Sequence, residues 1–257
     1  MLGNGTSLIP YQKDVLLNLV TCALVIAGGI GFPVIFELPL KHFSWKRQSM
    51  HTRVVLSTTF ALLLFGTLLL KLTESISWLG AFFYSVSART AGFSTYNLGD
   101  FSTAGLLVVS GLMFIGASPA STGGGIKTTT FFVLLSGIYS AATNHSERAF
   151  HNAIPKDAFR KASVISMLAV FLVMTASYLM LIFDPQLSLR DVLFEMISAF
   201  STSGLSTGIT PQLSAQSRIL SIIMMYIGRL GPLTVASLWY FTIGERVRYP
   251  EGTIAIG

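Results

Sequence analysis

The fold of this chain is decided by a glycine-rich stretch, Gly116-Ala117-Ser118-Pro119-Ala120-Ser121-Thr122-Gly123-Gly124-Gly125-Ile126-Lys127, which separates two apolar runs, Thr103–Ile115 and Thr128–Ala142. Each run is about 14 residues long, which at ~1.5 Å per residue is roughly two thirds of a bilayer crossing. The two runs and the loop between them therefore predict one interrupted membrane span. Non-helical backbone at membrane depth is tolerated only where protein covers it or where it lines a water-filled cavity, so the interruption predicts a functional site.

The composition is typical of a helical membrane protein. Hydrophobic residues make up 52% of the chain and charged residues 11%, which predicts one integral membrane domain over residues 1–257. The net charge of +6 does not indicate a nucleic-acid partner, because the basic residues form short clusters between apolar runs. The single cysteine, Cys22, lies in an apolar run, which excludes an internal disulfide and predicts core packing.

Apolar runs also predict the other spans. Full spans are expected at Val15–Phe36, Val54–Leu72, Ala162–Phe183 and Ser217–Thr242. Two shorter runs, Ser77–Arg89 and Ser188–Ser201, are too short to cross and predict helices that enter the membrane and turn back, the second with a capping box at Ser188 and Asp191. Basic loops at 41–53, 145–161 and 246–248 belong on the inner side, which puts both re-entrant helices on the outer side.

A short motif follows each re-entrant helix. Its two copies, Thr90–Thr95 and Thr202–Thr207, align without a gap at an offset of 112 residues, the separation of Gly92 and Gly204. Two copies in the same orientation imply a quasi-rotational axis along the membrane normal. Loops with so little side-chain bulk can turn carbonyl oxygens toward this axis and replace the water shell of a monovalent cation, and the C-terminal ends of the re-entrant helices favour a cation there. The predicted filter residues are Thr90, Ala91, Gly92, Phe93, Thr202, Ser203, Gly204 and Leu205.

Three stretches, Ser87–Phe93, Gly116–Thr130 and Ser198–Gly208, resemble the Trk/Ktr/HKT superfamily of cation transporters, and the segment around Ser121–Lys127 is most similar to the bacterial Ktr-type membrane subunit. The resemblance implies an all-α membrane protein built of repeated units, each a span, a re-entrant pore helix, a filter loop and a second span, with one broken transmembrane helix. Residues 46–145 would be the third of four pore repeats and residues 146–257 the fourth, preceded at 1–45 by the outer loop and last helix of the second. We therefore expect a partial subunit that needs the missing N-terminal repeats or a second membrane subunit.

The resemblance also implies that the broken helix forms a gate beneath the filter. The gate residues would be Gly116, Ala117, Ser118, Pro119, Ala120, Ser121, Thr122, Gly123, Gly124, Gly125, Lys127 and Arg229. Arg229 lies near the middle of the predicted last span, where a charge costs about 2.5–3.5 kcal/mol, so it is expected to face the pore as a barrier or to bind helix-end carbonyls. Lys127 either pairs with loop carbonyls or an acidic group or extends to the inner face. Arg89 is expected to be structural, with Glu195 as its candidate partner.

By this resemblance the function is potassium uptake across the cell (plasma) membrane by a multi-pass protein that is not an enzyme. Potassium ion is then the transported substrate, with sodium dependence and no organic cofactor, and the four histidines, 42, 51, 145 and 151, show no ligand pattern. The implied partners are the lipid bilayer, a second copy in a homodimer and a cytoplasmic nucleotide-binding regulatory subunit, with no nucleic acid. Two alternatives are a non-conducting membrane assembly subunit and a secondary transporter of another solute. A phosphate-binding loop is excluded because Ile126 separates Gly125 from Lys127.

Overall fold

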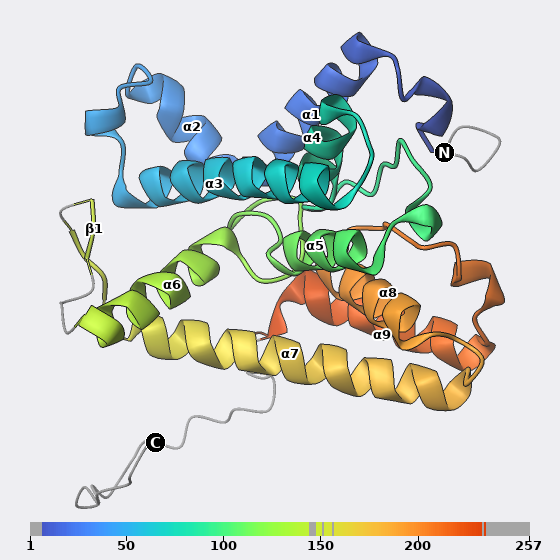
Figure 1. Ribbon diagram of the computed structural model, residues 1–257. Coiled ribbons are helices and arrows are strands. Elements are labelled where there is room, and N and C mark those ends of the chain that lie inside the picture. The colour runs from blue at the N-terminus through green and yellow to red at the C-terminus, as the bar shows by residue number, and fades with distance from the viewer. Residues whose placement is uncertain (1–6, 144–147, 151, 156, 233, 235–257) are drawn as a thin grey trace, which may run out of the picture.

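Two long parallel helices frame the molecule in the computed structural model, which describes residues 7–143, 148–150, 152–155, 157–232 and 234 (Figure 1). These helices, α3 (Met50–Thr73) and α7 (Ala158–Phe183), are long and apolar enough to cross a membrane. The remaining helices are α1 (Val15–Ile30), α2 (Phe32–Leu40), α4 (Trp78–Ser87), α5 (Thr103–Phe114), α6 (Thr128–Thr143), α8 (Leu189–Ser201) and α9 (Ala215–Leu230). Short 3-10 turns lie at Ile9–Tyr11, Trp45–Arg47, Leu98–Asp100 and Thr210–Gln212. The predicted all-α architecture is confirmed.

The chain repeats one arrangement twice. In the first unit α3 is followed by the short helix α4 and the interrupted pair α5 and α6; in the second unit α7 is followed by the short helix α8 and then α9. Serine side chains begin both short helices, since Ser77 accepts from the amide of Gly80 and Ser188 accepts from that of Asp191. The Ser188 and Asp191 cap that the sequence predicts is therefore present.

Equivalent polar contacts close both units at the same end. The Glu74 carboxylate, after α3, accepts from the amide and hydroxyl of Ser102 at 2.9 and 2.6 Å. The Asp184 carboxylate, after α7, accepts from the amide and hydroxyl of Ser214 at 3.1 and 3.0 Å. Hydrogen bonds from the hydroxyl of Ser217 and from Ser214 hold the pKa of Asp184 below its ordinary value. Each acidic residue thus ties the end of the unit's first helix to the N-cap of the unit's third helix, α5 or α9.

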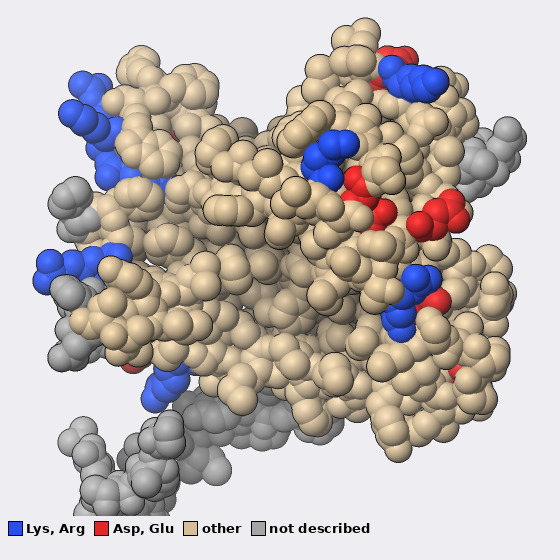
Figure 2. Space-filling view, viewed as in Figure 1, with Lys and Arg blue, Asp and Glu red and all other residues tan. Residues whose placement is uncertain are grey.

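The charges are distributed unevenly between the two ends of the molecule. Figure 2 shows Lys and Arg predominating at the left end, where α3 and α7 begin, whereas the right end carries most of the visible Asp and Glu. The left end also carries a small hairpin of β1 (Arg148–Ala149) and β2 (Asn152–Ala153), whose Phe150 packs edge-on against Trp45. By the positive-inside rule this left end is the inner side.

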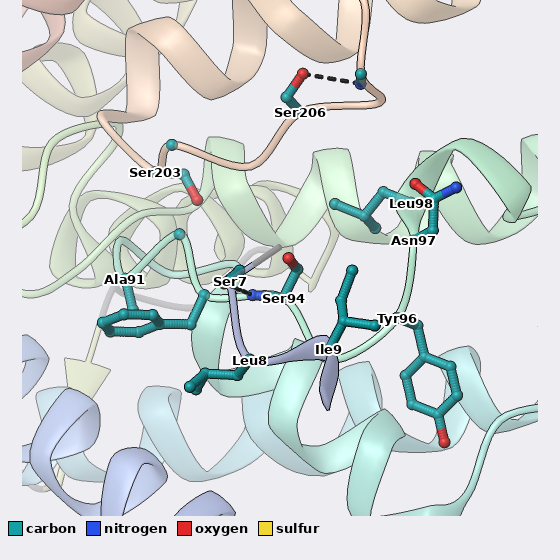
Figure 3. A pocket seen from close by; sticks show the side chains of 14 residues that line it. Ser7, Leu8, Ile9, Ala91, Ser94, Tyr96, Asn97, Leu98, Ser203 and Ser206 are labelled. Atoms are coloured by element: carbon teal, nitrogen blue, oxygen red, sulfur yellow. Dashed lines mark hydrogen bonds between the residues drawn. The ribbon is translucent and has the colours of Figure 1, made fainter. Parts of the chain in front are cut away.

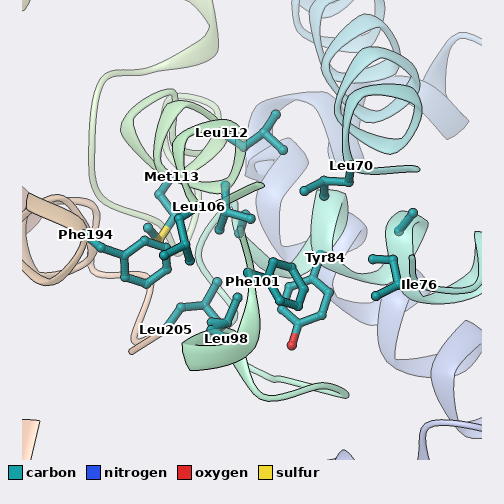
Figure 4. Close-up of a cluster of buried hydrophobic side chains, with 13 residues drawn as sticks. Leu70, Ile76, Tyr84, Leu98, Phe101, Leu106, Leu112, Met113, Phe194 and Leu205 are labelled. Carbon is teal, nitrogen blue, oxygen red and sulfur yellow. The ribbon is translucent and has the colours of Figure 1, made fainter. Parts of the chain in front are cut away.

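One of the buried apolar clusters joins the two units. Tyr84, Phe101 and Leu106 of the first unit pack with Phe194 and Leu205 of the second (Figure 4). Each of these side chains is at most 5% exposed. Because burying apolar surface stabilises the fold by about 25 cal/mol per Å², the cluster holds the short helices α4 and α8 in place. The two loops that follow these helices are therefore carried on a packed core.

The first predicted span, Val15–Phe36, is not straight. Helices α1 and α2 meet at an angle of 97° at Gly31, whose φ of 92° disfavours any residue with a β-carbon. A β-carbon at Gly31 would also lie 2.5 Å from the carbonyl oxygen of Pro119. Helix α9 ends in nearly the same conformation, with φ 90° and ψ 138° at Gly231 against φ 92° and ψ 144° at Gly31. Most of the predicted span beyond Leu230 lies outside the described residues.

Candidate functional site

The two threonine-glycine loops have the same unusual backbone. In the first TG loop (Thr90–Thr95), φ is 106° at Thr90 and 71° at Gly92; in the second TG loop (Thr202–Thr207), it is 54° at Thr202 and 84° at Gly204. The residue between them, Ala91 or Ser203, is not among the described residues with positive φ. Non-glycine residues rarely adopt positive φ, so both threonines are held in strained positions by the surrounding fold.

The carbonyl groups of these loops are largely unused by the protein. Among the hydrogen bonds of the described residues, none is accepted by the main-chain carbonyls of Thr90, Ala91, Gly92, Thr202, Ser203, Gly204 and Leu205. The carbonyl of Phe93 differs, because it accepts from the hydroxyl of Ser87 at 2.6 Å. Within the described residues, seven of the eight predicted filter carbonyls therefore accept no hydrogen bond, while that of Phe93 is engaged with the end of α4.

The TG loops contact each other directly. A β-carbon placed on Gly92 would lie 2.4 Å from the carbonyl oxygen of Ser203, and one on Gly204 would lie 3.8 Å from the α-carbon of Gly92. The hydroxyl of Ser203 donates to the carbonyl of Ala88 at 3.0 Å, which fastens the second loop to the end of α4. The sequence repeat predicted that the two loops would meet, and the structure brings them together.

An open cavity of about 750 Å³ lies beside both loops. Figure 3 shows Ser203 and Ser206 of the second TG loop above, with Ser7, Leu8 and Ile9 of the N-terminal segment below them. This segment is hydrogen-bonded to the first TG loop, since the amide of Leu8 donates to the carbonyl of Ser94 at 3.0 Å. Four of the seven residues with unbonded carbonyls, Ala91, Gly92, Ser203 and Gly204, line this cavity.

The two ends of the glycine-rich loop (Gly116–Lys127) are held together by main-chain contacts. Ile115 and Ile126 form a parallel bridge, and the amide of Ile126 donates to the carbonyl of Phe114 at 3.1 Å. Near the same two ends, the hydroxyls of Ser118 and Thr128 lie 3.0 Å apart, and both residues are fully buried. The interruption between α5 and α6 is therefore a folded loop with defined ends.

Two glycines of this loop lie against the two threonines of the TG loops. A β-carbon on Gly123 would be 2.3 Å from the side chain of Thr90, and one on Gly124 would be 2.7 Å from the hydroxyl of Thr202. The amide of Gly124 donates to that hydroxyl at 3.0 Å. Because any larger side chain would displace the threonines, the glycines allow the glycine-rich loop to approach both TG loops at once.

Both basic residues predicted for the gate bind carbonyls of the glycine-rich loop. The Lys127 amino group donates to the carbonyl of Gly123 at 2.5 Å, and the Arg229 guanidinium donates to the carbonyl of Thr122. Arg229 lies in the last turn of α9 and not in the middle of a helix. The partial negative charge at the C-terminal end of a helix favours a cation in this position. On the other side, the amide and hydroxyl of Thr122 both lie 3.4 Å from the carbonyl of Gly28 in α1.

The expected pairing of Arg89 with Glu195 is absent. Arg89 is 6% exposed, and its Nε has no hydrogen-bond partner within the part of the chain that the structure describes. Glu195 instead accepts from the hydroxyls of Ser206 and Thr210. Residue spacing could not distinguish these outcomes, because it does not show on which side of a short helix each side chain lies. The contact of Gly28 with the loop was also not predicted, because Gly28 lies within an apolar run that predicts only a membrane span.

The described residues contain no group of three or more His, Cys, Asp or Glu that could hold a metal ion. The groups described at the site are main-chain carbonyls, threonine hydroxyls and the cationic side chains of Lys127 and Arg229. Free carbonyls suit a weakly held cation, which they can bind without a fixed negative charge.

Comparison with known proteins agrees with this chemistry. Residues 50–242 match the sequence model of the TrkH family, described as cation transport protein. The chain is 35% identical over 272 residues to Ktr system potassium uptake protein D of Bacillus subtilis (strain 168), covering 98% of this chain and 60% of that protein. It is also 35% identical over 271 residues to Ktr system potassium uptake protein B of Vibrio alginolyticus, covering 98% of this chain and 58% of that protein.

A solved structure shows the same fold. The crystal structure of the potassium transporter TrkH from Vibrio parahaemolyticus superposes with a TM-score of 0.71 at 17% identity, covering 88% of this chain and 52% of the other. The chain spans about 60% of the length of the curated relatives that it matches. Its apolar helices make it a multi-pass protein of the cell membrane. From the match over residues 50–242 and the shared fold, the chain belongs to the TrkH family of cation transport proteins.

Proposed function

We propose that this chain supplies part of a potassium uptake pathway, in which the two TG loops form half of a selectivity filter and the glycine-rich loop is the gate beneath them. The observation that carries the proposal is the stack of three loops: seven free carbonyls in the TG loops, with the glycine-rich loop in contact with the threonine of each. Carbonyl oxygens can replace the hydration shell of a potassium ion, which is the cargo named for the two Ktr relatives.

Two loops do not surround an ion, so the proposal includes a completing partner. The remaining filter loops would come from N-terminal repeats joined to this chain or from a second membrane subunit, with residues 46–145 and 146–257 as the third and fourth repeats. A homodimer, a cytoplasmic nucleotide-binding subunit and sodium dependence belong to the same proposal and follow from the family resemblance.

A complementation experiment tests the transport function. The portion of the Bacillus subtilis relative that this chain does not match is joined to the chain, and the chimaera is produced in bacteria that lack potassium uptake. We expect growth at low potassium and saturable potassium uptake, whereas the chain alone should support neither. Absence of uptake by a chimaera that is correctly inserted and folded would favour the non-conducting assembly role or transport of another solute.

The filter assignment is tested by Gly92→Ser. This substitution puts a side chain where even a β-carbon meets the Ser203 carbonyl, so we expect weaker selectivity for potassium over sodium. The matched control is Gly111→Ser in α5, because a β-carbon there has no atom within 4 Å. If Gly92→Ser and Gly111→Ser have the same selectivity, the TG loops are not the filter.

The gate assignment is tested by deleting residues 120–124. The deletion removes the contacts of the glycine-rich loop with Thr90 and Thr202, so we expect faster potassium flux through the chimaera. A slower flux in a protein that elutes and melts like the parent would argue against a gate.

A further inference from the structure

The two TG loops are held from behind by chemically different groups. The hydroxyl of Tyr84, a fully buried residue of α4, donates to the carbonyl of Tyr96 at 2.6 Å and accepts from its amide at 3.0 Å. The hydroxyl of Ser87 adds its bond to the carbonyl of Phe93. Neutral hydroxyl groups therefore fix the segment that follows Gly92.

A carboxylate takes this place behind the second TG loop. Glu195 of α8 is 9% exposed, and its Oε1 accepts from the hydroxyl of Ser206 and from that of Thr210, the latter at 3.2 Å. The hydroxyl of Ser206 in turn accepts from the amide of Gly208 at 2.9 Å and lies 2.9 Å from that of Thr210. One carboxylate thus organises the two hydroxyls and the amide that follow Gly204.

The difference between the two loops is specific to these helix positions. At the repeat offset of 112 residues, Glu195 corresponds to Phe83 and Tyr84 corresponds to Met196, and both Phe83 and Met196 are buried and apolar. Tyr84 of α4 and Glu195 of α8 thus lie at adjacent positions of the repeat, and at each of these two positions the other helix carries an apolar residue.

The surroundings of Glu195 leave its carboxylate to the loop. A cavity of about 280 Å³ behind the second TG loop is lined by Glu195, Gly204, Leu205 and Arg218, among others. The guanidinium of Arg218 donates to the carbonyl of Pro211 at 3.0 Å, and no ion pair between Arg218 and Glu195 occurs within the described part of the chain. The hydrogen bonds of Glu195 Oε1 therefore go to the hydroxyls of Ser206 and Thr210 rather than to Arg218.

We infer that Glu195 is the positioning residue of the second TG loop: by binding Ser206 and Thr210 it sets the path of the backbone that presents the carbonyls of Gly204 and Leu205. Tyr84 does the same for the first TG loop. The hydrogen bonds that hold the two loops can be tested on the isolated chain. Their effect on ion selectivity rests on the proposed function.

Amide hydrogen exchange of the purified full-length chain in detergent tests the bracing without any transport measurement. In Glu195→Leu the two hydroxyls lose their acceptor, and we expect exchange of the amides in 204–210 to become about tenfold faster, which corresponds to ~1.4 kcal/mol. Exchange in 90–96 should stay unchanged. Glu195→Gln keeps an acceptor oxygen of the same size and should retain most of the protection.

Matched variants separate a local effect from general loosening. Tyr84→Phe should give the reverse result, with faster exchange in 90–96 and unchanged exchange in 204–210. Ser206→Ala removes the acceptor of the Gly208 amide and should make that amide exchange faster, which tests the loop even if Glu195→Leu does not fold. Faster exchange of both loops in Glu195→Leu, or no change in either, would overturn the inference. Equal exchange for Ser206→Ala and the parent would do so as well.

Transport by the chimaera then measures the effect on selectivity. Glu195→Leu should lower the ratio of potassium to sodium uptake at least about fivefold, and Glu195→Gln should restore most of it. Glu74→Leu removes an acidic residue whose hydrogen bonds within the described chain go to Ser102, and it should leave the ratio unchanged. If the parent chimaera transports no potassium, the proposed function fails while the exchange result stands. If the parent is selective and Glu195→Leu is equally selective, the inference fails alone.

Discussion

Alanine at Gly92 and alanine at Gly204 should have different consequences, although the two glycines occupy the same position of the repeat. Both have positive φ, 71° and 84°, so alanine at either position costs about 1–2 kcal/mol of backbone strain. Only Gly92→Ala adds a collision, because its β-carbon would lie 2.4 Å from the carbonyl oxygen of Ser203, against a lower limit of 3.0 Å for real contacts. That carbonyl must therefore retreat by about 0.6 Å.

The Ser203 carbonyl is one of the proposed ion ligands, so its displacement should appear as lost selectivity. We expect both variants to melt at a lower temperature than the parent, Gly92→Ala by the larger amount because the collision adds to the strain, measured on the purified chain by intrinsic tryptophan fluorescence. In the chimaera, Gly92→Ala should reduce the ratio of potassium to sodium uptake at least about tenfold, the equivalent of ~1.4 kcal/mol. Gly204→Ala should reduce it much less, since its β-carbon would lie 3.8 Å from the nearest atom.

Equal loss of selectivity in the two variants would refute this reasoning, because it would mean that strain in the loops matters and the contact between them does not. A larger loss in Gly204→Ala would refute the assignment of the Ser203 carbonyl as the ligand that Gly92 accommodates.

Three further predictions concern the gate, the outer end and the helix contact. Arg229→Ala removes a cation bound to the glycine-rich loop and should raise potassium flux through the chimaera, whereas Arg229→Lys should not; equal flux in both would contradict a gating role. Hydrogen bonds from the start of α9 hold the pKa of Asp184 below its ordinary value, so they stabilise the fold at neutral pH and are lost as the pH falls through the folded pKa. Between pH 7 and pH 3 the melting temperature of the parent should therefore fall more than that of Asp184→Asn. Gly228→Ala would put a β-carbon 1.7 Å from the carbonyl oxygen of Phe200 and should destabilise the chain by about 1–3 kcal/mol in chemical denaturation, whereas alanine at the open site Gly111 should not.

The repeat predicted the meeting of the two TG loops because small residues and offsets are readable in sequence. Thr90 and Thr202 precede glycines at the same offset, and the structure gives both threonines positive φ and brings the two loops into contact. The interruption at Gly116–Lys127 was also predicted, since a run of glycines with proline cannot continue a membrane helix. These features depend on backbone conformation, which glycine, proline and short polar residues specify locally.

Features that depend on tertiary partners could not be predicted in the same way. The 97° bend at Gly31 was missed because its sequence, Gly28 to Pro33, also fits a straight helix with a packing surface of small residues. The bend at Gly31 depends on the contact with the carbonyl of Pro119, which belongs to a distant segment of the chain. The choice of Ser206 and Thr210 by Glu195, in place of Arg89, likewise depends on which way each side chain leaves its helix.

Thr122 binds two helices that are distant in sequence, with its amide at 3.4 Å from a carbonyl of α1 and its own carbonyl accepting from Arg229 of α9. A change in the backbone dihedral angles of Thr122 alters both hydrogen bonds. The free energy of moving the glycine-rich loop therefore depends on the positions of both helices. Linkage of this kind is reciprocal. Any partner that shifts the inner end of α9 biases the loop, and any ion that displaces the loop changes, by the same free energy, the affinity of α9 for that partner.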